Sequence, residues 1–136
     1  MKTDPSQLRD LAERYTAAWC GNDPASVAAF YSSAGSLRVN GADPAVGRDA
    51  IADVARGFMT AFPDLKLTMD DLIIRGDGAV YHWTFAGTNT GTGGTGQRVL
   101  FSGYEIWEIG ADGLIAESQG HFDEANYQRQ LIQGID

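Results

Sequence analysis

Polar side chains alternate along residues 114–123, near the C-terminal end of the chain. If this segment is a β-strand, successive side chains point to opposite sides, so one face carries Glu117, Gln119, His121 and Asp123. A carboxylate near an imidazole is a pair that enzymes use for general acid/base catalysis. The pattern therefore predicts a proton-transfer site, provided that apolar walls enclose this face.

Asp123 is the first candidate for the acid/base group. Desolvation at the mouth of an apolar cavity would raise the pKa of its carboxyl group and let it exchange a proton near neutral pH. His121 lies two residues earlier on the same face, with its Cβ atom roughly 7 Å from that of Asp123, and the two could share one substrate. Both have structural alternatives: Asp123 directly precedes residues 124–127 and could cap a helix there, and His121 could bond a backbone carbonyl.

The preceding strand segment, residues 99–109, offers a second acid. Alternation places Phe101, Glu105, Trp107 and Ile109 on one face. If that face points inward, Glu105 is a buried carboxyl group that can position a substrate oxygen. Otherwise Glu105 forms a salt bridge at the rim or with another subunit.

Aromatic residues recur at helical or strand spacing, and we expect them to form the apolar wall of a cavity. Most aromatics in such positions are simply core residues, so this is a prediction for the set: Trp19, Phe58, Phe62, Trp83 and Trp107. Tyr15 lies on the apolar face of the first predicted helix, where a core role is the stronger alternative. Together with Gln119 it could position substrate oxygens.

The elements that must position these residues change in character along the chain. Up to residue 63, apolar residues recur at helical spacing and predict helices at about residues 8–20, 24–31 and 51–62. A turn is expected at 33–35 and a short strand at 36–40. From residue 65 the apolar period is two, which predicts strands within 65–70, 80–88, 99–109 and 114–122, then a short helix near Tyr127 and Leu131.

Helices followed by an antiparallel meander predict a single α+β domain, residues 1–136, in which the helices cover one face of the sheet. The single Cys20 excludes an internal disulfide, and His82 is the only histidine besides His121, so a metal site is not expected. The net charge of −8 disfavours nucleic acid and anionic membranes, and there is no apolar run of about 20 residues to span a membrane. We therefore expect a cytoplasmic protein.

Residues 91–96 match the dinucleotide-binding pattern G-x-G-x-x-G. A strand is expected after them, however, so no helix N-terminus would receive a pyrophosphate. The segment instead predicts a flexible hairpin loop at the rim of the pocket.

Several short segments carry a family resemblance: residues 62–65 (FPDL), 83–91 (WTFAGTNTG), 112–117 (DGLIAE) and 122–123 (FD). Together with the order of elements, they resemble the SnoaL-like polyketide cyclases. These share the cone-shaped fold of nuclear transport factor two and ketosteroid isomerase. The resemblance implies a cone-shaped α+β barrel, with three N-terminal helices packed on a curved, mainly antiparallel sheet.

The resemblance also implies cofactor-independent chemistry, with Asp123 at the place of the family's acid/base aspartate. Gln119 departs from the family, where a large apolar residue is common at this place. In the ketosteroid isomerase branch an acid and a tyrosine near the places of Glu105 and Tyr15 hold the substrate oxygen. The strand that supplies that branch's base has no acid here, since residues 37–40 read LRVN.

These observations favour a cyclase, isomerase or hydratase that acts on a small hydrophobic molecule containing a carbonyl group. The alternative is a noncatalytic ligand-binding or association domain of the same fold. In that case exposed residues of the outer sheet face would form a homodimer surface, among them His82, Tyr104 and Ile106.

Overall fold

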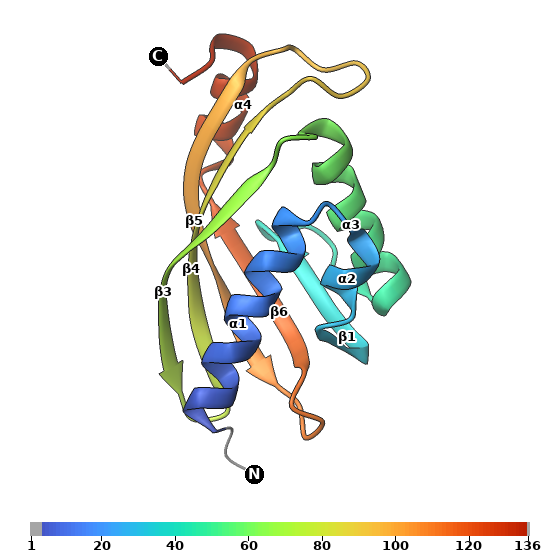
Figure 1. Cartoon of the computed structure of the whole chain (residues 1–136), viewed down its shortest axis with the longest axis vertical. Coiled ribbons are helices and arrows are strands. Elements are labelled where there is room, and N and C mark those ends of the chain that lie inside the picture. The colour runs from blue at the N-terminus through green and yellow to red at the C-terminus, as the bar shows by residue number, and fades with distance from the viewer. Residues whose placement is uncertain (1–3, 136) are drawn as a thin grey trace.

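The computed structural model describes residues 4–135, which form a curved six-stranded sheet and four helices (Figure 1). In chain order the elements are α1 (Pro5–Cys20), α2 (Pro24–Ala28), β1 (Tyr31–Val39), β2 (Ala45–Val46), α3 (Arg48–Ala61), β3 (Lys66–Arg75), β4 (Gly78–Thr88), β5 (Arg98–Ile109), β6 (Ile115–Phe122) and α4 (Glu124–Gln133). The α+β class is confirmed, with a fourth helix after the sheet.

The strands are arranged in the order β2-β1-β6-β5-β4-β3. Strands β3 to β6 form an antiparallel meander, as their period of two and their turns predict. Strand β1 pairs with β6 in parallel and β2 pairs with β1 antiparallel, so the sheet is mainly antiparallel. Helices α1, α2 and α3 lie on one side of this sheet (Figure 1).

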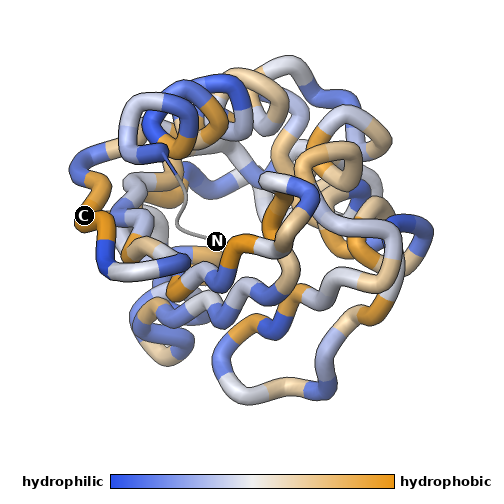
Figure 2. The backbone as a smooth tube through the Cα atoms, turned by 90° about the horizontal axis from the view of Figure 1, so that it is seen from below, coloured by the Kyte–Doolittle hydropathy of each residue, from blue (hydrophilic) through white to orange (hydrophobic). Residues whose placement is uncertain are grey.

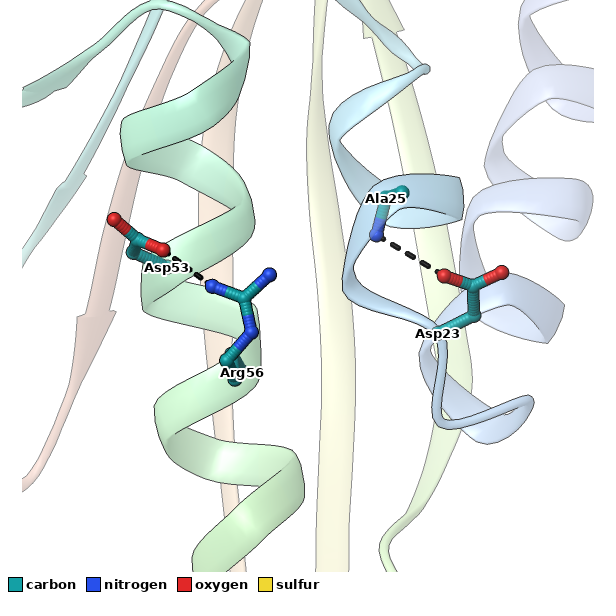
Figure 3. Close-up of polar contacts among 4 residues, drawn as sticks. All are labelled: Asp23, Ala25, Asp53 and Arg56. Carbon is teal, nitrogen blue, oxygen red and sulfur yellow. Dashed lines mark hydrogen bonds and ion pairs between the residues drawn. The ribbon is translucent and has the colours of Figure 1, made fainter.

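Helix boundaries follow from local capping. The side chain of Asp4 accepts a hydrogen bond from the backbone N–H of Ser6 at 2.9 Å, and proline occupies the first position of α1. At α2 the Asp23 carboxylate accepts from the N–H of Ala25 at 3.1 Å, in the same arrangement (Figure 3). These caps satisfy N–H groups that have no partner within the helix.

Charged residues mark the solvent side of the helices. Asp53 and Arg56 form an ion pair one turn apart on the exposed side of α3 (Figure 3). In Figure 2, hydrophobic and hydrophilic segments alternate within single elements. The apolar side chains of both layers meet in one core between the helices and the inner face of the sheet.

The second helix is shorter than predicted, and the turn expected at residues 33–35 is wrong. Helix α2 ends at Ala28, and β1 begins at Tyr31, which pairs with Ile115 of β6. The register shifts between Tyr31 and Ser36, so the polar segment is an irregular part of the strand. A Cβ at Gly35 would lie 2.9 Å from the backbone oxygen of Ile115, so glycine permits this close approach.

The glycine-rich segment joins β4 to β5 as a hairpin loop, so the element directly after it is a strand and not a helix. Asn89 is buried and holds the loop, because its Nδ2 donates to the Ala61 oxygen at 3.1 Å and its Oδ1 accepts from the Thr95 N–H at 2.7 Å. At Gly91 a Cβ would lie 2.0 Å from the backbone oxygen of Thr60. The glycines therefore allow the loop to pack against the end of α3.

Strand β5 extends beyond the end of β6, and α4 completes this part of the sheet. The last pair between the two strands joins Gly103 to Phe122. Past it, the backbone N–H of Leu100 donates to Gln130 Oε1 at 2.7 Å, and Gln130 Nε2 donates to the Leu100 oxygen at 2.9 Å. The buried side-chain amide of Gln130 thus takes the place of a neighbouring strand.

Among residues 4–135, no helix combines the length and the apolar composition that crossing a membrane requires.

Two glycines on the inner face of the sheet should respond differently to alanine. At Gly103 a Cβ would lie 2.4 Å from the His121 oxygen and 2.5 Å from the Trp83 ring, whereas at Gly120 the nearest atom, the Arg38 oxygen, is 3.4 Å away. We expect Gly103→Ala to lower the free energy of unfolding by about 1–3 kcal/mol through overpacking. Gly120→Ala should leave it nearly unchanged. Urea denaturation measures both, and equal losses would contradict this packing.

Candidate active site

An apolar cavity of about 60 Å³ lies between the helices and the inner face of the sheet. Its walls come from both layers of the fold and include Trp19 of α1, Val54 and Phe58 of α3, and Trp83, Phe85 and Phe101 of the sheet. Gly120 and Phe122 of β6 complete the wall beside them. The volume exceeds the space that one water molecule needs.

Glu105 is the one ionisable side chain among the residues that border this cavity. Of the two alternatives left open by the sequence, the structure shows the inward one, since Phe101, Glu105, Trp107 and Ile109 are all buried. Glu105 itself is only 8% exposed. A carboxyl group in such a place needs hydrogen-bond partners, because burial removes its hydration.

Three donors supply those partners, and all bind the same oxygen. Glu105 Oε1 accepts from Tyr15 Oη at 3.1 Å, Trp107 Nε1 at 2.9 Å and Ser118 Oγ at 2.8 Å. The hydroxyl groups of Tyr15 and Tyr31 are 3.0 Å apart, and since Tyr15 gives its single proton to Glu105, Tyr31 donates to Tyr15. Oε2 receives no hydrogen bond from residues 4–135, so it is the oxygen available to a ligand.

Burial controls the protonation of this cluster. Desolvation raises the pKa of Glu105, and the hydrogen bonds from Trp107, Ser118 and Tyr15 oppose that shift without cancelling it. The pKa values of Tyr15 and Tyr31 are also raised, first by burial and then by the nearby Glu105 charge. The two tyrosines therefore stay neutral donors while Glu105 titrates closer to neutrality than an exposed carboxyl group.

The polar face of β6 does not form the floor of the cavity, and this prediction is wrong. Gln119 pairs with Ile106 and His121 pairs with Tyr104, and both partners are exposed on the outer face of the sheet. The rings of Tyr104 and His121 lie 5.1 Å apart there, and Gln119 donates to Glu117 at 2.7 Å. Alternation grouped these residues correctly, but their shared face is the outer one.

The inner face of β6 instead carries Ser118, Gly120 and Phe122. Ser118 is fully buried and binds Glu105, while Gly120 and Phe122 border the cavity. Small side chains at this place leave room in front of Glu105. Ser118 and Tyr31 were not among the site residues predicted from the sequence. The position of Ser118 opposite Trp107 would have indicated its place once β5 and β6 were paired.

Asp123 lies outside the cavity and caps α4. Its side chain is exposed and accepts a hydrogen bond from the backbone N–H of Asn126 at 3.0 Å. This is the helix-capping alternative named above. The placement of Asp123 as the acid at the cavity mouth is therefore not supported by the geometry.

The predicted aromatic wall divides into two groups. Trp19, Phe58 and Trp83 border the cavity. Tyr15, Phe62 and Trp107 are buried in the core behind it, where Tyr15 and Trp107 bind Glu105 and Phe62 packs on Phe85 with ring centroids 5.2 Å apart. The glycine-rich loop does not border the cavity either, so its predicted place at the rim is wrong.

In the part of the chain that the structure describes, no group of three or more histidine, cysteine, aspartate or glutamate side chains is arranged to hold a metal ion. Glu105 is surrounded by neutral donors, and neither of the two salt bridges within residues 4–135 involves it. The chemistry that this arrangement offers is proton exchange by a carboxyl group in an apolar pocket.

Fold and cavity together define a cone-shaped α+β protein of the small-molecule enzyme or binding class. The family model of SnoaL-like polyketide cyclases matches residues 9–131. The chain belongs to this family, as its sequence motifs predict.

Solved structures share the fold. TsrD from Streptomyces laurentii is 28% identical, with a TM-score of 0.81 over 94% of this chain and 96% of that one. AclR from Streptomyces galilaeus is 22% identical, with a TM-score of 0.80 over 94% and 97% of the two chains. A ketosteroid isomerase-like protein from Catenulispora acidiphila, 14% identical, has a TM-score of 0.79 over 89% and 91% and shows the shared fold alone. No significant match is found among curated protein sequences.

The raised pKa of Glu105 predicts a pH-dependent contribution to stability. Between the pKa values of the unfolded and folded states, the folded protein holds a proton that the unfolded chain has released. This contribution is fully present below the unfolded pKa and is lost as the pH rises through the folded pKa. We therefore expect the free energy of unfolding of the wild type to fall relative to that of Glu105→Gln as the pH rises above 4.5, the ordinary pKa of a glutamate side chain.

Urea denaturation of both proteins across this pH range measures the difference. Asp64 and Asp112 have pKa values lowered by hydrogen bonds, and they are present in both proteins, so their effect cancels. Parallel stability curves would show that Glu105 does not titrate in this range.

Proposed function

We propose that this chain is a cofactor-independent enzyme that transfers protons on a small apolar carbonyl compound, with Glu105 as its acid/base group. The product would be a cyclised, isomerised or hydrated molecule. The reaction class is the one expected from the sequence, but the acid/base residue is Glu105 in β5 and not Asp123 after the end of β6. Membership of the SnoaL-like family supports a small-molecule substrate.

The proposal rests on one observation. A buried carboxyl group borders an apolar cavity, and one of its oxygens accepts three hydrogen bonds while the other accepts none from residues 4–135. Three donors fix Oε1 of Glu105, so the carboxyl plane cannot rotate freely. Oε2 has no partner within residues 4–135 and remains available for proton transfer. A fixed group of raised pKa beside an apolar cavity suits general acid/base catalysis.

The chemistry can be written with Glu105 alone. Ionised Oε2 removes a proton from the carbon next to the carbonyl group, and the electrons of that C–H bond form an enolate. The protonated carboxyl group then returns the proton to another carbon, which gives an isomer. In a cyclisation the enolate attacks a second carbonyl group of the same molecule, and Glu105 protonates the resulting alkoxide.

Exchange of hydrogen for deuterium tests the first step without knowledge of the natural substrate. In D2O, we expect the protein to accelerate deuterium incorporation next to the carbonyl group of at least one member of a panel of cyclic ketones and diones. Glu105→Gln keeps the size of the side chain and removes the titrating group, so its rate should fall by about 10²-fold or more. NMR spectroscopy of the ketone measures the rate.

Asp123→Asn is the matched control, because asparagine is an equally good helix cap. This variant should exchange at the wild-type rate. Loss of exchange in Asp123→Asn with retention in Glu105→Gln would reverse the assignment. Binding of the ketones without exchange by the wild type would favour the noncatalytic alternative.

For the partner, we propose that two copies of the chain associate through the outer face of the sheet. Three apolar side chains on the outward positions of β5 support this: Leu100, Tyr104 and Ile106 are 50%, 39% and 42% exposed. A row of exposed apolar residues on one sheet face is typical of association surfaces.

Sedimentation equilibrium tests this association. We expect a dimer in the wild type and a monomer in Ile106→Glu, because a buried unpaired carboxylate at the interface is costly. Asp53→Ala on the exposed side of α3 is the control and should stay dimeric. A monomeric wild type at micromolar concentration would reject the proposal.

A further inference from the structure

Glu105 lies between the apolar cavity and a group of hydrogen-bond donors. In the strand register Glu105 is opposite Gly120 of β6. Two residues toward one end of β6, Phe122 borders the cavity, and two residues toward the other end, Ser118 is opposite Trp107. Neither Ser118 nor Trp107 borders the cavity. The carboxyl group of Glu105 therefore has a polar side and an apolar side.

The donors on the polar side bind one oxygen and determine where the acid proton lies. Ser118 Oγ donates to Glu105 Oε1 at 2.8 Å, beside the Trp107 indole at 2.9 Å and the Tyr15 hydroxyl at 3.1 Å. A proton on Oε1 would point toward donors that are already in place. When Glu105 is protonated, its proton is therefore carried by Oε2, the oxygen left to face the cavity.

Neutral groups surround Glu105 in the part of the chain that the structure describes. The titratable side chains near it are Tyr15 of α1, Tyr31 of β1 and Tyr81 of β4, and α3 contributes apolar side chains to the cavity wall. Burial raises the pKa of each tyrosine, so all three stay neutral while Glu105 titrates. Burial raises the pKa of Glu105, and its three hydrogen bonds lower it. Each donor therefore affects directly how readily Glu105 releases a proton.

Ser118 is the donor whose removal disturbs the core least. The ring of Trp107 stacks on that of Tyr81 with centroids 4.8 Å apart, and the hydroxyl groups of Tyr15 and Tyr31 are 3.0 Å apart. Trp107 and Tyr15 are large, fully buried side chains, so replacing either would open a cavity in the core. Ser118 is equally buried but contributes only a hydroxymethyl group. Tyr31, which also interacts with the Ser118 hydroxyl, keeps Tyr15 as a partner when the serine is replaced.

We propose that Ser118 is a positioning residue for the reaction, whose hydroxyl holds Oε1 of Glu105 and so stabilises the ionised carboxylate with Oε2 directed at the cavity. This inference rests on the proposed function, in which Glu105 removes and returns a proton. Because Ser118 does not border the cavity, it acts on a substrate only through Glu105. Its hydrogen bond opposes the burial that favours the protonated form.

A titration of Glu105 in the full chain tests the inference without any substrate. Ser118→Ala leaves the burial of Glu105 in place and removes a donor to its ionised form, so the pKa of Glu105 should rise by about one pH unit or more. ¹³C NMR spectroscopy of protein labelled at the glutamate side-chain carboxyl carbon measures this pKa. The Glu105 signal is assigned by its absence from the spectrum of Glu105→Gln.

The pH profile of deuterium exchange into the ketones is the second measurement. Exchange begins with ionised Glu105, so its rate should rise with pH through the pKa of this residue, and in Ser118→Ala the rise should move to higher pH. Below both pKa values the variant should exchange about tenfold more slowly, and at high pH the two rates should converge. Ser118→Thr keeps a hydroxyl group and should restore the wild-type profile. Ser118→Cys keeps the size and supplies a weaker donor, so its profile should be intermediate.

Tyr81→Phe is the matched control, because it removes a buried hydroxyl that binds Thr16 and not Glu105. Its ¹³C titration and pH profile should match those of the wild type, and a shift as large as that of Ser118→Ala would overturn the inference. An unchanged titration in Ser118→Ala would overturn it too, as would slower exchange at every pH with an unmoved profile, which marks a purely structural residue. If no ketone exchanges in the wild type while the titration moves as expected, the proposed reaction is rejected and the effect of Ser118 on Glu105 is upheld.

Discussion

The rest of this structure depends on the cost of placing one carboxyl group inside an apolar cone. Glu105 is tolerated there because donors from three other positions converge on a single oxygen: Tyr15 of α1, Trp107 of β5 and Ser118 of β6. Tyr31 of β1 supports the arrangement through Tyr15. A change in any of these elements would leave a buried charge or a buried donor unpaired, so the polar cluster fixes how the helices and strands pack.

The family and the α+β class could be predicted from the sequence because they depend on local periodicity and on motifs. Helical spacing before residue 63 and a period of two after residue 65 correspond to α1, α3 and the β3–β6 meander. The irregular strand that begins at Tyr31 could not be predicted in this way. Its polar residues are typical of a turn, and the strand is recognised from its pairing with β6 at Tyr31 and from Ser36 onward.

The site was predictable in part for a similar reason. Alternation identifies which residues of a strand share a face, and it grouped Gln119 with His121 correctly, but it does not say which face points inward. On β5, the three partners of Glu105 on its face, Phe101, Trp107 and Ile109, are large and apolar, which is the pattern of an inner face. On β6 two of the three inner residues, Ser118 and Gly120, are small, so they give no apolar signal, although Gly120 leaves space in front of the carboxyl group. Size, not polarity, marks the inner face there.

The amide of Gln130 has a consequence for the behaviour of the protein at high concentration. A strand that extends beyond its neighbour leaves unpaired backbone N–H and C=O groups, and such edges are templates for pairing with other chains. By binding both the N–H and the oxygen of Leu100, Gln130 occupies the edge at the point where β6 has ended. Helix α4 therefore protects the sheet against edge-to-edge aggregation, a role that its short length and exposed surface would not suggest.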